Sequence, residues 1–193
     1  MLRFQARLSD SEHAKRSFEE AAQRIVALGS LYDRLGNDPD DVTLASDFIR
    51  HLAASLEKTL NKPGRPVEIQ VNAEASDLPS PVAFDLGLIV NELVTNACKY
   101  GLSDDGSCRI EISFRTRQQL AELIVADGGP GLPPDLDPHK AQTLGMIIIR
   151  SLASRLKAEV SVERGAGARF RLRFPVEPSG SDGKSRPNDN AAG

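Results

Sequence analysis

The sequence predicts a fold of the α/β class, of the α+β kind, in which helices and a sheet form a two-layer sandwich. Apolar residues follow a helical period up to about residue 60 and then alternate with polar residues over 67–71. Two more strand-like runs follow at 109–116 and 120–126. A loop rich in Gly and Pro, from 127 to about 138, separates them from an apolar helical segment at 144–156.

The chain is predicted to divide into a helical hairpin at 1–38, a layer domain at 40–176 and a disordered tail at 177–193 that has almost no apolar residues. Ser9 and Glu12 have the spacing of a capping box, which predicts the start of a helix. The apolar residues of that helix recur in heptad steps and therefore require a partner helix. They are Ala14, Phe18, Ala21, Ile25, Leu28, Tyr32 and Leu35.

The layer domain begins with an amphipathic helix that the breaker at 62–64 ends. Its apolar stripe consists of Leu44, Phe48, Leu52 and Leu56. A second helix has Pro81 in its first turn, and Gly101 is expected to end it in the left-handed conformation. The final strands, near 160–163 and 169–174, are expected to form a hairpin.

Composition excludes several classes of function. The formal net charge of −3 over 193 residues gives no electrostatic reason to expect nucleic acid or an anionic membrane as a partner. Cys98 and Cys108 lack the spacing of a zinc site or a disulfide framework, so a reduced, cytoplasmic setting is expected. No apolar run approaches the ~18 residues of a membrane span, and no signal peptide is visible.

The second helix carries the most informative segment, NELVTNACKY at 91–100. Glu92, Asn96 and Lys99 share one stripe of this helix and present a carboxylate, an amide and an ammonium group side by side. Such a set suits a metal-bound polyphosphate. A second, apolar stripe is predicted to pack into the core. It consists of Leu86, Ile89, Val90, Leu93 and Ala97.

Three glycine-containing motifs follow, and each has a purely structural alternative. Asp127 opens DGGPG after a strand, where its carboxylate could accept the exocyclic N–H of adenine; the alternative is an ordinary Asp-Gly turn. Thr143 opens TLGM before a helix, which is either an anion site or a plain N-cap. The GAGARF segment at 165–170 is either part of a binding site or a tight hairpin turn.

Taken together and in this order, the four segments resemble the N, G1 and G2 boxes and the final glycine turn of one superfamily. This superfamily is defined by the ATP-binding domain that gyrase, Hsp90, histidine kinases and MutL share, which is known as the Bergerat fold. The resemblance covers about residues 66–175. Within it, the chain most resembles sensor histidine kinases allied to the HWE group. It departs from that group in having Asn91 where the group has His, and in having no Trp.

The resemblance implies roles for individual residues with ATP and Mg²⁺ as cofactors. Asn96 would hold the metal ion, Lys99 would neutralise phosphate charge, and Glu92 would be the catalytic residue near the γ-phosphate. Asp127 would read adenine in a pocket shaped by glycines, and residues 132–142 would form a lid. The other cofactor-binding positions would be Gly129, Gly131, Thr143, Leu144, Gly145 and Gly167.

The resemblance also implies a kinase that phosphorylates a histidine on a dimerisation helix, in the same or a partner chain, and then a response regulator receiver domain. His13, His51 and His139 lack the flanking Arg and Asn of that acceptor, which is expected upstream of Met1. The hairpin would then be truncated, and this chain alone would not autophosphorylate. Two alternatives remain: a non-catalytic phosphotransfer or docking module, and a serine kinase of the anti-sigma type.

Overall fold

The computed structural model describes residues 41–133, 141 and 143–176. The predicted hairpin at 1–38, the tail at 177–193 and most of the lid at 132–142 lie outside these residues, as do His13 and His139.

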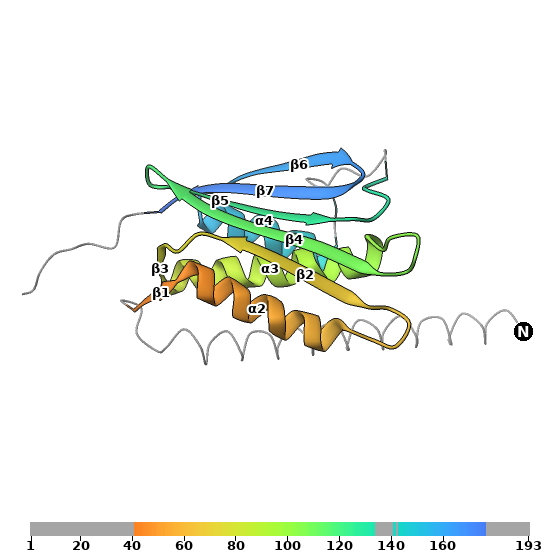
Figure 1. The fold of residues 1–193 in the computed structure, drawn as a ribbon. Coiled ribbons are helices and arrows are strands. Elements are labelled where there is room, and N and C mark those ends of the chain that lie inside the picture. Colours follow the sequence, from red (N-terminus) through yellow and green to blue (C-terminus); the bar gives the residue numbers. More distant parts are fainter. Residues whose placement is uncertain (1–40, 134–140, 142, 177–193) are drawn as a thin grey trace, which may run out of the picture.

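A five-stranded sheet forms one layer, and three helices cover one of its faces (Figure 1). The strands lie in the order β2-β4-β5-β7-β6; β2 and β4 are parallel, and the other neighbouring pairs are antiparallel. Their bounds are β2 Val67–Ala73, β4 Cys108–Arg117, β5 Leu120–Asp127, β6 Glu159–Gly165 and β7 Gly167–Pro175. The helices are α2 Ala45–Leu60, α3 Ser80–Tyr100 and α4 Leu144–Arg155. The predicted two-layer fold is confirmed.

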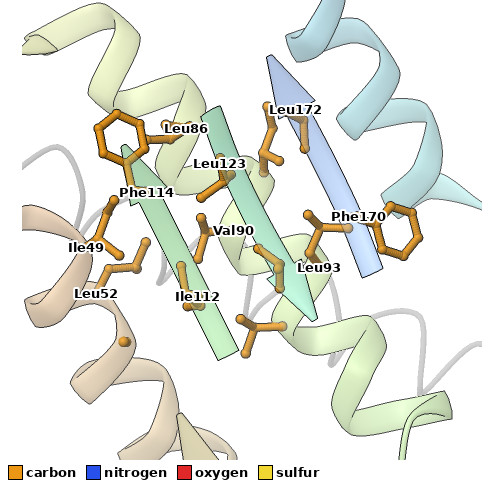
Figure 2. Packing of buried hydrophobic residues seen from close by; sticks show 14 of the residues in the cluster. Ile49, Leu52, Leu86, Val90, Leu93, Ile112, Phe114, Leu123, Phe170 and Leu172 are labelled. Carbon is orange, nitrogen blue, oxygen red and sulfur yellow. The ribbon is translucent and has the colours of Figure 1, made fainter. Parts of the chain in front are cut away.

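The core fills the space between the helices and the inner face of the sheet. Leu123 of β5 and Phe114 of β4 point toward Leu86 and Val90 of α3 (Figure 2). Because α3 packs between α2 and α4, its apolar stripe is buried along the whole length of the layer. This burial fixes the rotation of α3 about its axis, and with it the direction of the polar stripe on the same helix.

The outer face of the sheet is charged and carries no helix in the described part of the chain. Glu122 lies at its centre and is only 6% exposed. Burial by itself raises the pKa of this carboxyl, but hydrogen bonds from Arg173 (2.7 Å) and Arg115 (2.8 Å) outweigh burial and hold the pKa below its ordinary value. The residues predicted for the site, on α3 and at the end of β5, belong to the other, helix-covered side of the sheet.

The structure adds two strands and corrects one expectation. The strands β1 (Val42–Leu44) and β3 (Asp77–Pro79) form a small antiparallel pair that was not predicted, because three residues are too few to show a period. Gly101 follows α3 as expected, but the prediction of a left-handed conformation was wrong: its φ is −106°. Glycine is required at position 101 because the backbone packs closely against Asp127, and not because of its backbone conformation.

Candidate functional site

Asp127 ends β5 on the inner face of the sheet, where it continues the series Ala121, Leu123 and Val125. Its Oδ1 accepts hydrogen bonds from the N–H groups of Gly129 (3.0 Å) and Ala168 (3.2 Å). Its Oδ2 has no hydrogen bond to any residue that the structure describes. Burial raises the pKa of Asp127 above its ordinary value, although these two N–H groups act in the opposite direction. One carboxylate oxygen therefore fixes the side chain, and the other makes no hydrogen bond within the described residues.

Glycines bring backbone segments close to Asp127. A Cβ atom on Gly101 would lie 2.7 Å from Cγ of Asp127, and one on Gly129 would lie 2.4 Å from Cα of Gly101. Gly167 has a φ of +92°, and a Cβ atom there would lie 1.8 Å from the carbonyl oxygen of Asp127. Gly131, with a φ of +81°, lies against the carbonyl oxygen of Gly165. The backbone at Gly101 and Gly167 thus lies directly against Asp127, with no side chain between them.

Replacing Gly167 with alanine is expected to destabilise the fold, because the new Cβ atom overlaps the Asp127 carbonyl and the backbone conformation disfavours a side chain. The strain alone costs about 1–3 kcal/mol. Gly165→Ala is the matched control, since a Cβ atom at Gly165 would meet no atom within 4 Å. Thermal unfolding compares the two variants, and equal losses of Tm would contradict this account of Gly167.

The polar stripe of α3 meets the start of α4. A Cβ atom on Gly145 would lie 2.7 Å from Oε2 of Glu92 and 3.7 Å from Oδ1 of Asn96, so the backbone of α4 passes directly over both side chains. Glu92 is buried, whereas Asn96 and Lys99 on the same stripe are half-buried. The helix motif and the TLGM segment, which are far apart in the sequence, therefore lie side by side in the structure.

Thr143 is the N-cap of α4. Its hydroxyl accepts a hydrogen bond of 3.4 Å from the N–H of Met146, and its carbonyl accepts one of 3.0 Å from Ile147. The N–H groups of Leu144 and Gly145 come before the first hydrogen bond of the helix and so have no partner within it. The side chain of Thr143 therefore serves as a cap, as one of its two interpretations predicted, and the backbone after it offers donors.

One helix connects the two parts of the site. Gly101, which lies against Asp127, follows Asn96 by five residues and Glu92 by nine. At 1.5 Å per residue these separations are roughly 7 and 13 Å along the axis of α3. Asp127 therefore lies at one end of a site whose other end holds Glu92, Asn96 and the start of α4.

Sequence reasoning missed two contributors to this site. Gly101 was read as a helix end, although it makes the close approach to Asp127. Ala168 was given no role of its own within the GAGARF segment, although its backbone N–H donates to Oδ1 of Asp127. The glycine directly after the helix motif is a signal that could have found the first; a backbone donor such as that of Ala168 leaves no signal in the sequence.

Three features together define a class of ATPase domain. Helices cover one face of a sheet, an acidic side chain is fixed at the end of a strand, and a polar helix stripe lies under the start of a helix that contains a glycine. Residues 82–178 match the family described as histidine kinase-, DNA gyrase B-, and HSP90-like ATPase. The match covers half of the chain, and the chain belongs to this family. Membership implies ATP as the nucleotide.

The relatives of this chain are sensor histidine kinases. Blue-light-activated histidine kinase 2 of Erythrobacter litoralis is 33% identical over 155 residues, which are 77% of this chain and 44% of the relative. Sensor histidine kinase PdtaS of Mycobacterium tuberculosis is 25% identical over 181 residues, which are 91% of this chain and 36% of the relative. The chain thus spans less than half the length of both curated relatives.

Solved structures of histidine kinases share this fold. The histidine kinase domain of the Erythrobacter litoralis EL346 blue-light activated histidine kinase superposes with a TM-score of 0.70 and 26% identity, over 80% of this chain and 74% of that chain. The mycobacterial sensor histidine kinase MprB shares the fold at a TM-score of 0.54 and 17% identity, over 72% of this chain and 98% of that chain. Within the described residues, no helix has the length and apolar character needed to cross a bilayer.

Proposed function

We propose that this chain is the ATP-binding catalytic part of a two-component sensor histidine kinase. One observation carries the proposal: α3 connects two groups of polar side chains. At one end lies Asp127, whose Oδ2 makes no hydrogen bond within the described residues. At the other end lie Glu92 and Asn96, over which the start of α4 passes. The first group suits a base with an exocyclic amine, and the second suits phosphates. The reaction is assigned to the cytoplasm, where ATP is available.

At the adenine end, Oδ2 of Asp127 accepts the exocyclic amine of the base. Because Oδ1 is held by the backbone of Gly129 and Ala168, the carboxylate does not have to reorganise when the base binds. Gly129 and Gly131 keep side chains away from the plane of the base. The pocket therefore selects adenine by one oriented acceptor and by shape.

At the phosphate end, Asn96 holds Mg²⁺ through its side-chain oxygen, a ligand type that this ion prefers. Lys99 and the N–H groups of Leu144 and Gly145 add positive charge and donors around the phosphates. Bound ATP with its Mg²⁺ supplies the phosphoryl group. Glu92 orients the acceptor, and the protein acts mainly by positioning and charge neutralisation.

The proposed acceptor is a histidine on a dimerisation helix, of the same or a partner kinase chain, and the final recipient is a response regulator receiver domain. The names of the relatives support this choice, since both are histidine kinases. A docking module that has lost nucleotide binding would not need the oriented carboxylate of Asp127. A serine kinase of the anti-sigma type would use the same nucleotide site and differs in the residue that it phosphorylates.

Radiolabelled ATP separates these functions. The chain alone is expected to bind ATP and remain unlabelled, because His13, His51 and His139 all lack the Arg and Asn that flank an acceptor histidine. His51, the one histidine among the described residues, is also exposed on α2, on the opposite side of α3 from α4. Addition of a separate helical segment that carries an acceptor histidine with its flanking Arg and Asn is expected to give an acid-labile, base-stable phosphoprotein. An acid-stable product would favour the serine kinase, and absence of ATP binding would favour the docking module.

A further inference from the structure

The two cysteines of the chain meet away from the polar stripe of α3. Cys98 lies in the last turn of α3, and Cys108 is the first residue of β4. Both are buried, and their Sγ atoms are 2.7 Å apart. Both thiols are free in this structure. Neither side chain has to move far for the two sulfurs to bond.

The surrounding backbone holds this pair in place. Cys108 pairs with Val67 of β2, and its N–H donates to the carbonyl of Pro66 at 2.8 Å. The loop between the cysteines is closed by a hydrogen bond of 2.9 Å from the N–H of Ser103 to the carbonyl of Ser107. Because both ends of the loop are fixed, the contact between the sulfurs is a stable feature of the folded chain.

The charges around the pair distinguish the two thiols. Nη2 of Arg65 donates to the carbonyl oxygen of Cys98 at 2.6 Å, and Nε of Arg65 is buried without a hydrogen-bond partner in the described part of the chain. A hydrogen bond from Cys108 lowers the pKa of Cys98, against burial and with help from the charge of Arg65. The same hydrogen bond, together with burial, raises the pKa of Cys108. The two shifts favour the thiolate at Cys98 and the thiol at Cys108, which makes Cys98 the better candidate for a nucleophile.

We propose that Cys98 and Cys108 are a site of reversible oxidation, at which a peroxide converts the two thiols into a disulfide that ties the end of α3 to β4. The Cys98 thiolate attacks a peroxide oxygen, and the cleaved O–O bond leaves a sulfenic acid and, for hydrogen peroxide, one water. Cys108 then attacks that sulfur, the S–O bond breaks, and a second water leaves. Two thiols and one hydrogen peroxide thus give one disulfide and two waters, and a dithiol reverses the step.

The test uses the full chain treated with hydrogen peroxide and then denatured. The count of reactive thiols is expected to fall from two to none, with a mass loss of about two units, and dithiothreitol should restore both thiols. The oxidised chain should remain monomeric on a non-reducing gel and have a higher Tm, because the bond restricts the unfolded chain.

Two variants sharpen the test. Cys108→Ser keeps the nucleophile without its partner and should gain oxygen atoms instead of losing hydrogen. Arg65→Gln should slow disulfide formation several-fold while the final thiol count stays at zero. Two thiols that remain reactive in the peroxide-treated parent would overturn the proposal, and so would a disulfide-linked dimer. An oxygen gain located on Cys98 or Cys108 that dithiothreitol does not reverse would also overturn it, whereas oxygen gained at Met1 or Met146 is methionine oxidation and does not count.

Discussion

Asp127→Asn is expected to lose most ATP binding while its fold remains at least as stable as that of the parent. An asparagine Oδ1 can accept the same two N–H groups, from Gly129 and Ala168, so the side chain keeps its orientation. Its Nδ2 then replaces the free oxygen and presents a donor to the adenine amine, which is also a donor. Loss of a charge-assisted hydrogen bond costs about 2 kcal/mol, roughly a thirty-fold increase in Kd.

The stability half of this prediction follows from the direction of the pKa shift. The folded state raises the pKa of Asp127, so folding favours the protonated carboxyl. The stabilising effect of that proton is present below the ordinary pKa and is lost as pH rises through the raised one. At neutral pH the ionised carboxylate therefore destabilises the fold, and replacing it with a neutral amide removes this destabilisation.

Calorimetry and thermal unfolding of the same samples measure both effects. For the parent, ATP affinity is expected to fall as pH is lowered, starting at a higher pH than for an ordinary carboxyl group, because protonation removes the acceptor. The variant should lack this component of the pH dependence. Unchanged affinity in Asp127→Asn would remove Asp127 from the adenine site, and a large loss of Tm would show that its charge is structural.

Asn96→Ala is expected to abolish the dependence of ATP binding on Mg²⁺. Asn96 lies half-buried beneath the start of α4, and its side-chain oxygen is the ligand proposed for the ion. In the parent, Mg²⁺ should strengthen ATP binding. In the variant, the ratio of the affinities with and without Mg²⁺ should approach one.

The measurement is a titration with ATP in the presence of Mg²⁺ and in the presence of a chelator. Asn72→Ala is a suitable control, because Asn72 is an exposed amide on β2, away from α3. It should keep the Mg²⁺ dependence of the parent. Retention of that dependence in Asn96→Ala would assign the ion to other ligands and would leave the adenine site unaffected.

The long elements could be predicted because each shows a clear period. The alternation at Val67, Ile69 and Val71 and the helical stripe from Leu86 to Ala97 were read directly, and β2 and α3 lie where expected. The strands β1 and β3 are too short to show any period. They form because each provides the other with hydrogen-bond partners, which is a property of the folded chain.

The site was predictable in its residue types and less so in its arrangement. The motifs indicated Asp127 and Asn96, but their glycines had ordinary turns and caps as alternatives. The choice between a binding site and an ordinary turn or cap depends on distances between segments that are far apart in the sequence. The close approach of Gly167 to Asp127 is one example. The contact between Cys98 and Cys108 is of the same kind, since the spacing of the two cysteines gave no sign of it.

The double use of α3 has a consequence for the dynamics of the domain. One stripe of this helix lies in the core between α2 and α4, and the adjoining stripe carries Glu92, Asn96 and Lys99. Its middle amides should therefore exchange with solvent hydrogen only through opening of the whole domain, as in other central helices. The polar stripe of α3 is then as rigid as the folded domain, and any motion that admits or releases the proposed nucleotide must come from the segments around α3.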